Sequence, residues 1–385
     1  MKQKCVDRMV APDILKIAAS LFVIIIHHKV GKDSHFIAMR NLLVLIVFAI
    51  CVALGIYLFT RELNNKSKPA RCVFMLMLPV AAFAALIVFR KFAVAIFLII
   101  SGYLLCGSMD KCTMKEWYTK RNIIPRVLRF YFPFVFIFAV GLIYKIFVLR
   151  YEYTFLEVVA RFILGGFKPG SYYITILAEL VVVFPVIYAV VKRFGFGGVI
   201  ICTVFTLTYD VCSTYLGMSP VAYKFLIFRF TSHIAFGIYA RISEYEKCKK
   251  LNFAVFLLGV SYALLCMTFK IVEPKIFFQW QEASFPTAFL LYPVIVWFFN
   301  RFNGLQYNDT ALSRSVMLFS NATYHIFLVQ LLYYTTFGFP FNEYVGNVAI
   351  TMPINILVTV PVGIAYYKLI SVWENKFISK VRSLL

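Results

Sequence analysis

The chain has 385 residues, of which 62% are hydrophobic, and its mean hydropathy is +0.83. A soluble domain cannot bury that much apolar surface, so the composition excludes a soluble protein and indicates a polytopic membrane protein. The formal net charge is +22, but the basic residues are scattered between apolar runs. That pattern argues against a nucleic-acid partner and is typical of membrane topology signals.

Apolar stretches long enough to cross a membrane recur along the whole chain. We expect an all-α transmembrane helix bundle of about 10–12 spanning helices, allowing for short or tilted ones. With a cytoplasmic N-terminus, the segments on the inner side carry most of the Lys and Arg residues, so the positive-inside rule places both termini in the cytoplasm. The predicted spans are 12–30, 40–59, 72–89, 92–107, 130–149, 172–191, 197–217, 222–240, 252–271, 284–299, 315–337 and 347–368.

The sequence predicts a single integral membrane domain. The nine cysteines show no metal-type spacing, so we expect neither a metal site nor a structural disulfide. No soluble domain and no clear internal repeat is evident. Within the domain at 1–385 we distinguish a motif-bearing part at 10–135, a remaining helix bundle at 136–370 and a short basic C-terminal tail at 371–385.

The first predicted helix carries ionisable side chains inside the membrane. Lys16 and His27 lie on nearly the same helix face, about 16 Å apart along the axis. Asp13 and Lys16 are three positions apart and can pair, which lowers the cost of burying each of them. His27 titrates near neutrality and can take a proton from a hydroxyl. The alternative is that Lys16 and His27 only anchor the two helix ends at the membrane interfaces.

Arginines gather just before the predicted span 130–149, where the chain enters the membrane from the cytoplasm. Arg126 and Arg129 share one helix face, and Arg121 lies just before them. Guanidinium pairs bind phosphates through bidentate hydrogen bonds, so a cytosolic phosphorylated donor such as a coenzyme A thioester fits this position. The alternative is a topology signal or a contact with anionic lipids.

Further polar residues lie inside predicted spans. Ser101 precedes Gly102 in an apolar helix, where close helix packing is the simpler interpretation. The others are individually accounted for as buried polar groups with hydrogen-bonding partners. The candidate cavity-lining residues are Ser101, Glu179, Asp210 and His233. His325 and Gln330 also lie inside a predicted span.

Three motifs follow one another along the chain: Lys16 with His27, the run Phe97-Leu-Ile-Ile-Ser101-Gly102-Tyr103, and Arg126-Val-Leu-Arg129. In this order they resemble the acyltransferase-3 family of integral membrane O-acyltransferases. The resemblance covers about residues 10–135 and is only general in hydropathy beyond them. The family pattern often has a histidine where this chain has Gln330. The stretch between the first two motifs is longer than in that pattern, which implies extra helices.

The resemblance implies an enzyme that moves an acyl group, usually acetyl, from cytosolic acyl-CoA to a hydroxyl. The implied acceptor is an envelope glycan or a lipid-linked saccharide, and the implied location is the inner or plasma membrane, as a multi-pass protein among membrane lipids. No cofactor is expected to stay bound, since acetyl-CoA is a donor substrate. The implied catalytic residues are His27, Lys16 and Asp13, and the implied acyl-CoA-binding residues are Arg126, Arg129 and Arg121.

Three other functions remain open at this stage. A transporter or flippase for saccharides or small metabolites suits many spans, but it predicts repeats with matching helix breaks, and we recognise none. A polysaccharide polymerase favours a large outer loop, and the loop at 150–171 is modest. A non-catalytic membrane sensor is compatible with Gln330, although the intact pair of Lys16 and His27 argues against it.

Overall fold

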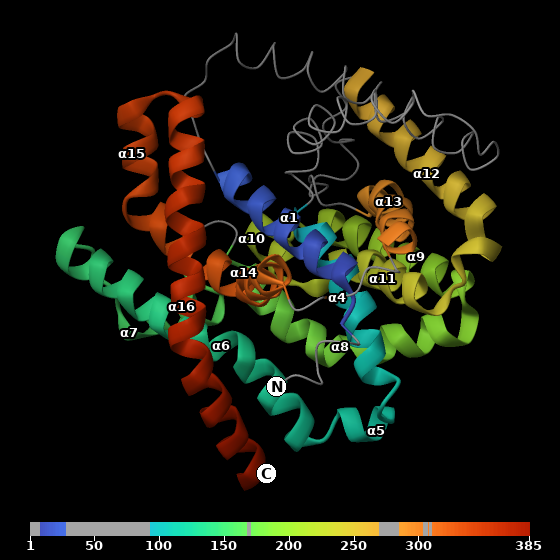
Figure 1. Ribbon diagram of the computed structural model, residues 1–385, viewed down its shortest axis with the longest axis horizontal. Helices are drawn as coiled ribbons and strands as arrows, with labels where there is room; N and C mark the ends of the chain where they lie inside the picture. Colours follow the sequence, from blue (N-terminus) through green and yellow to red (C-terminus); the bar gives the residue numbers. More distant parts are fainter. Residues whose placement is uncertain (1–7, 28–92, 168–170, 269–284, 303–306, 308–309) are drawn as a thin grey trace.

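The computed structural model describes residues 8–27, 93–167, 171–268, 285–302, 307 and 310–385 (Figure 1). Within these ranges it is helical, with no strand. The elements are α1 (Val10–His27), α4 (Ala93–Met109), α5 (Met114–Trp117), α6 (Lys120–Ile143), the π-helical turn η3 (Tyr144–Val148), α7 (Phe155–Ile163), α8 (Tyr173–Phe194), α9 (Phe196–Tyr215), α10 (Pro220–Phe225), the 3₁₀ turn η4 (Ile227–Phe230), α11 (Thr231–Ile242), α12 (Tyr245–Thr268), α13 (Pro286–Phe302), α14 (Ala311–Thr336), α15 (Gly338–Val345) and α16 (Val348–Leu384).

The prediction of an all-α membrane protein is confirmed for this part of the chain. Five helical stretches in it are long and apolar enough to cross a membrane, and α4 is a shorter apolar helix. The predicted spans 40–59 and 72–89 lie outside the described residues. The five stretches are Lys120–Val148, Tyr173–Phe194, Phe196–Tyr215, Ala311–Thr336 and Ile350–Leu384.

One predicted span is not a continuous helix. The segment 222–240 divides into α10, η4 and α11 because Leu226 has an extended backbone, with φ −98° and ψ 131°. The break frees the backbone N–H of Ile227, which would otherwise lack a partner inside the protein. That N–H donates to the Glu179 carboxylate at 2.7 Å. Glu179 therefore stabilises the start of the new helical turn.

Glycines bring α4 and α11 into backbone contact. A Cβ atom placed on Gly102 would lie 2.5 Å from the carbonyl oxygen of Ile234. A Cβ atom on Gly237 would meet the carbonyl oxygen of Ile99 on the facing helix. The Ser101-Gly102 motif thus sits where two helices pack closely, as small residues permit.

Three helices that carry sequence motifs or face them run in the same direction. Asp13 and Val23 of α1 contact Ser320 and Gln330 of α14, in that order along both helices. The helix α6 and its continuation η3 contact α14 in the same order, since Tyr324 donates to the Phe130 carbonyl and Tyr144 of η3 donates to the Thr336 carbonyl. The helices α1, α6 and α14 are therefore parallel, and their N-terminal ends lie at the same end of the bundle.

The last helix is longer than predicted. α16 has 37 residues, so it extends for about 55 Å, well beyond the roughly 30 Å thickness of a hydrocarbon core. It crosses α6, with the Phe132 and Phe377 rings stacked at 5.1 Å and the Tyr366 hydroxyl donating to the Pro133 carbonyl at 2.5 Å. The C-terminal end of α16 and the N-terminal end of α6 emerge at the same end of the molecule (Figure 1).

Candidate active site

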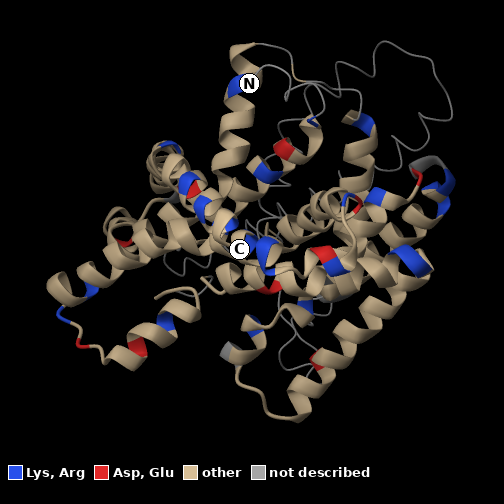
Figure 2. Ribbon diagram, turned by 90° about the horizontal axis from the view of Figure 1, so that it is seen from below, with Lys and Arg blue, Asp and Glu red and all other residues tan. Residues whose placement is uncertain are grey.

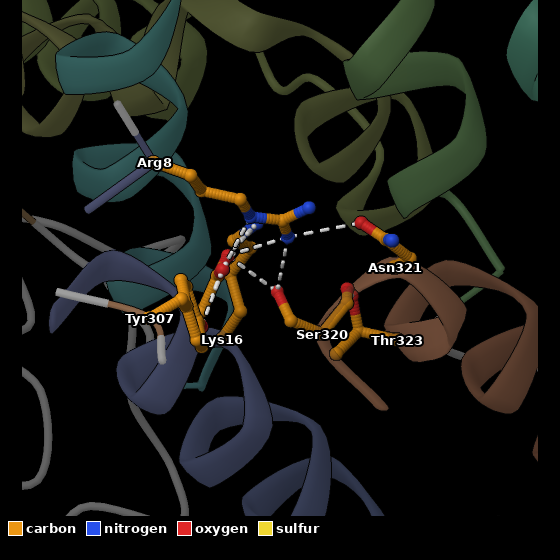
Figure 3. Close-up of polar contacts among 7 residues, drawn as sticks. Arg8, Lys16, Tyr307, Ser320, Asn321 and Thr323 are labelled. Atoms are coloured by element: carbon orange, nitrogen blue, oxygen red, sulfur yellow. Dashed lines mark hydrogen bonds and ion pairs between the residues drawn. The ribbon is translucent and has the colours of Figure 1, made fainter. Parts of the chain in front are cut away.

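A cluster of polar side chains surrounds Asp13 at the N-terminal end of α1 (Figure 3). Asp13 is 2% exposed. Its Oδ2 atom accepts from Arg8 Nε at 2.6 Å and from the Tyr307 hydroxyl at 2.8 Å. Its Oδ1 atom accepts from Lys16 Nζ at 2.8 Å and from the Ser320 hydroxyl at 2.6 Å. The expected pair of Asp13 and Lys16 is present, but it belongs to a larger cluster.

The Asp13 cluster, formed by these five side chains, holds two cations against one carboxylate. Burial acts to lower the pKa of Arg8, but the hydrogen bond and the charge of Asp13 outweigh it, so the pKa of Arg8 rises and the guanidinium stays charged. Burial, together with Asp13, raises the pKa of Tyr307, which therefore remains a neutral donor. The Asp13 cluster joins α1 to α14, and it carries a net positive charge.

His27 lies at the opposite end of α1 and contacts α14 as well. The Nδ1 atom of His27 lies 2.7 Å from Gln330 Nε2, which also donates to the Val23 carbonyl at 2.9 Å. The Tyr334 hydroxyl donates to the Ile24 carbonyl, and its ring meets the imidazole edge to face at 6.2 Å. His27 is half-buried, while Gln330 is fully buried. α14 therefore holds the imidazole in place.

These contacts define which nitrogen of His27 carries the proton. A carbonyl oxygen only accepts hydrogen bonds, so the Gln330 atom that faces the Val23 carbonyl is the amide nitrogen. The same nitrogen donates to Nδ1 of His27, so Nδ1 offers a lone pair. In the neutral imidazole the proton is then on Nε2. The lone pair that a base or nucleophile needs is the one that Gln330 occupies.

An aromatic cavity opens one helical turn beyond Gln330. It has a volume of about 570 Å³, and Tyr333, next to the His27-contacting Tyr334, is part of its wall. Among the residues that the structure describes, no charged side chain lines it, and aromatic faces dominate the wall. The lining residues are Tyr144, Tyr333, Thr336, Phe337, Pro340, Phe341, Tyr344 and Ile354.

The predicted arginines lie on the first turns of α6. The Arg126 guanidinium stacks on the Trp117 ring, with 3.7 Å between Cζ and the ring centroid. Trp117 is fully buried, and its indole N–H donates to the Val181 carbonyl at 2.9 Å, which fixes the ring. The Nη1 atom of Arg126 is buried without a hydrogen-bond partner among the described residues. Arg121 and Arg129 are exposed.

The residues proposed to line a cavity have partners away from His27. Glu179 accepts from Ile227, and the Asp210 carboxylate accepts from the Tyr223 hydroxyl at 2.7 Å. His233 Nε2 lies 3.0 Å from the Thr287 hydroxyl. These contacts involve α8 to α11 and α13, rather than α1 or α14. Ser101 is half-buried at the packing contact of α4 with α11.

The sequence did not reveal several polar residues of these sites. Arg8, Tyr307 and Ser320 complete the Asp13 cluster from segments far apart in the chain, so no local spacing indicates them. Arg229 is 3% exposed, and its Nε and Nη1 atoms have no hydrogen-bond partner within the described ranges. In the sequence, the feature that could have indicated Arg229 is its position as a single arginine within the apolar run Phe225-Leu-Ile-Phe-Arg229-Phe.

Comparison with protein families matches the chain to an acyltransferase domain (acyltransferase family 3) over residues 9–368. The comparison with curated proteins gives no match, and neither does the comparison with solved structures. The matched region includes the Asp13 cluster apart from Arg8, the contact of His27 with Gln330, and the arginines of α6. Since it covers nearly the whole chain, the protein belongs to the acyltransferase-3 family and is a membrane acyltransferase.

Proposed function

We propose that the protein moves an acyl group, acetyl above all, from cytosolic acyl-CoA to a hydroxyl of an envelope glycan or lipid-linked saccharide. The observation that carries this proposal is the parallel arrangement of α1, α6 and α14. Cations gather at their N-terminal ends, where Arg8, Lys16 and Arg126 lie. His27 and the aromatic cavity lie toward the other end. A donor with phosphates and an acceptor with hydroxyls would then approach from opposite ends.

The cationic end suits the donor. Coenzyme A carries a diphosphate and a 3′-phosphate, and guanidinium groups bind phosphates bidentately. Arg126 presents a buried, unpaired Nη1 atom on a fixed tryptophan ring, so this donor group is already positioned and desolvated. Arg129 and Arg121 lie exposed on the same helical segment. In this proposal the N-terminal end of α6 faces the cytosol, where acyl-CoA is made.

The aromatic cavity suits the acceptor. Aromatic faces stack on the apolar faces of sugar rings, and the hydroxyls of Tyr144, Tyr333 and Thr336 lie in its wall. Within the described part of that wall there is no charged group, which favours a neutral sugar ring over a charged one. The cavity begins one turn of α14 beyond Gln330, so a hydroxyl held at its inner end would lie close to His27.

The chemistry assigned to His27 is proton transfer or brief acyl transfer. As a base, the imidazole takes the proton of the acceptor hydroxyl while the hydroxyl oxygen attacks the thioester carbonyl. The new C–O bond forms, the C–S bond breaks, and coenzyme A leaves as the thiol with a proton. In the alternative route the imidazole nitrogen first takes the acyl group and then passes it to the acceptor. Both routes need an imidazole lone pair. If that lone pair is the one on Nδ1, the substrate must first displace the Gln330 amide.

Transfer of labelled acetyl groups tests the proposal. Membranes that contain the wild type, His27→Ala or the double variant Arg126→Ala/Arg129→Ala receive labelled acetyl-CoA at equal protein levels. Lys247→Ala is the matched control, since Lys247 is exposed and pairs only locally with Glu244 at 2.9 Å. We expect label in the glycan or lipid fraction with the wild type and the control, and loss of label with the other variants. Full transfer by His27→Ala would overturn the catalytic assignment.

A further inference from the structure

The chain continues beyond the region that matches the family. The match ends at residue 368, whereas α16 continues without a break to Leu384. This C-terminal extension of α16, residues 369–384, carries three cations and one carboxylate: Lys376, Lys380 and Arg382 with Glu374. The site described above does not use any of them.

Packing places the C-terminal extension beside the arginines of α6. The stacked rings of Phe132 and Phe377 fix the two helices at their crossing. α16 continues from Phe377 toward the same end of the bundle as the first turns of α6, and Lys and Arg segments gather around the C-terminus there (Figure 2). Arg382 comes close enough to Arg126 to repel it, as Arg129 does.

Two arginines act on Arg126, one from α6 and one from the end of α16. The charges of Arg129 and Arg382 both disfavour the charged form of Arg126, and the Glu374 carboxylate interacts with Arg129. Glu374 Oε2 also lies 3.8 Å from Nε2 of His325, too far for a hydrogen bond. A cluster of this kind is costly without an anion, because like charges raise each other's free energy. The Nη1 atom of Arg126 is a buried donor without a hydrogen-bond partner among the described residues, which an anion would satisfy.

A topology signal does not explain this convergence. Basic residues that mark the inner side of a membrane act by their number and need no common focus. Here a half-buried guanidinium, stacked on a tryptophan, interacts electrostatically with Arg382, near the end of a helix that is distant in sequence. The ligand chemistry that fits is a compound with more than one phosphate group.

We propose that Arg382 binds the 3′-phosphate end of the acyl-CoA donor. This inference rests on the proposed function. The acyl end of the donor must reach toward His27, so its nucleotide stays at the end of the bundle. Arg126 is half-buried and Arg382 is exposed, so the outermost phosphate falls to Arg382 and the diphosphate to Arg126 and Arg129. The C-terminal extension thereby adds a binding group that the family's matched region lacks.

Anionic lipid headgroups share the phosphate chemistry, and binding measurements separate the two sources. The full chain is placed in nanodiscs of neutral phosphatidylcholine and in nanodiscs that also contain phosphatidylglycerol. Affinities are measured for coenzyme A and for 3′-dephospho-coenzyme A. The proteins are the wild type, Arg382→Ala and the matched control Lys247→Ala.

We expect the wild type to prefer coenzyme A over the dephospho compound. Arg382→Ala should weaken coenzyme A binding about three- to tenfold, as for loss of one exposed charged contact, and leave the dephospho compound unaffected. The effect should appear in both lipid compositions. An unchanged preference in Arg382→Ala overturns the inference and leaves the proposed function standing. The same holds if the variant changes only the response to phosphatidylglycerol, which would assign Arg382 to lipid. If the wild type binds no coenzyme A, the proposed function itself fails.

Discussion

The side-chain amide of Gln330 donates a hydrogen bond to Nδ1 of His27 across 2.7 Å, from α14 to α1. Gln330 stands where the family pattern often has a histidine, and by sequence alone it was only a departure from that pattern. In the structure it is the neighbour that determines the tautomer of His27. The departure is therefore in direct contact with the proposed catalytic residue.

Replacing this neighbour should change the pH dependence of catalysis. In Gln330→Glu, a carboxylate would lie beside the imidazole and stabilise its protonated form. Since catalysis needs an imidazole lone pair, the acid limb of the activity profile should move to higher pH, by about one pH unit or more. Acetyl transfer measured across pH 5–9 would report the shift. Gln330→Met is the matched neutral variant, and an equal shift in it would contradict this account.

Loss of Asp13 should destabilise the bundle. In Asp13→Ala, Arg8 and Lys16 would face each other without their carboxylate, and the hydroxyls of Tyr307 and Ser320 would lose their acceptor. We expect a loss of about 2–4 kcal/mol, somewhat below the figure for a fully buried pair because both cations are partly exposed. Thermal unfolding of the detergent-solubilised protein measures it.

A milder change in the Asp13 cluster serves as comparison. Ser320→Ala removes one neutral donor and should cost about 1 kcal/mol. If the two variants unfolded at the same temperature, Asp13 would not be the centre of the cluster.

The glycines between α4 and α11 should not tolerate a methyl group. Gly237→Ala would drive its Cβ atom into the carbonyl oxygen of Ile99, so the helices must separate. The expected loss is about 1–3 kcal/mol. Gly107→Ala on α4 is the control, because the nearest atom to its Cβ would be Arg241 Nη2 at 3.8 Å. That variant should be neutral or slightly stabilising, since alanine favours helices. Equal effects of both variants would contradict close packing.

The tryptophan beneath Arg126 should affect donor affinity. Trp117→Phe keeps an aromatic ring but weakens the stacking and removes the hydrogen bond to the Val181 carbonyl. We expect the KM for acetyl-CoA to rise about threefold with kcat nearly unchanged, as for loss of about 0.6 kcal/mol of ground-state binding. Tyr118→Phe is the control, since Tyr118 donates to the neighbouring Val182 carbonyl. A fall in kcat alone would argue against a role in binding the donor.

Local patterns predicted much of the helical architecture. Apolar runs located α8, α9 and α14 to within a few residues, because hydropathy alone marks such helices. They failed at 222–240, where the extended backbone of Leu226 breaks the run and Glu179 accepts the freed N–H. They also ended the last helix at 368, since charged and polar residues interrupt the apolar run beyond it, but those residues still form helix and pack on α6.

The candidate site was only partly predictable for a similar reason. Asp13 and Lys16 lie one turn apart, so their pairing follows from helix geometry. The partners of His27 and Asp13 on α14 are some three hundred residues away in sequence, and only tertiary packing brings them together. Hydropathy and spacing contain no information about such contacts.

Two sets of hydrogen bonds connect α1 and α14, one in the Asp13 cluster and one between Gln330 and His27. Neither helix can slide by a turn without breaking both sets. The separation of fourteen residues between Asp13 and His27 corresponds to about 21 Å along α1. One residue inserted after Lys16 would rotate His27 by about 100° and turn it away from Gln330, while the Asp13 cluster stayed intact. The number of residues in this part of α1 thus determines where the proposed catalytic imidazole lies relative to the Asp13 cluster.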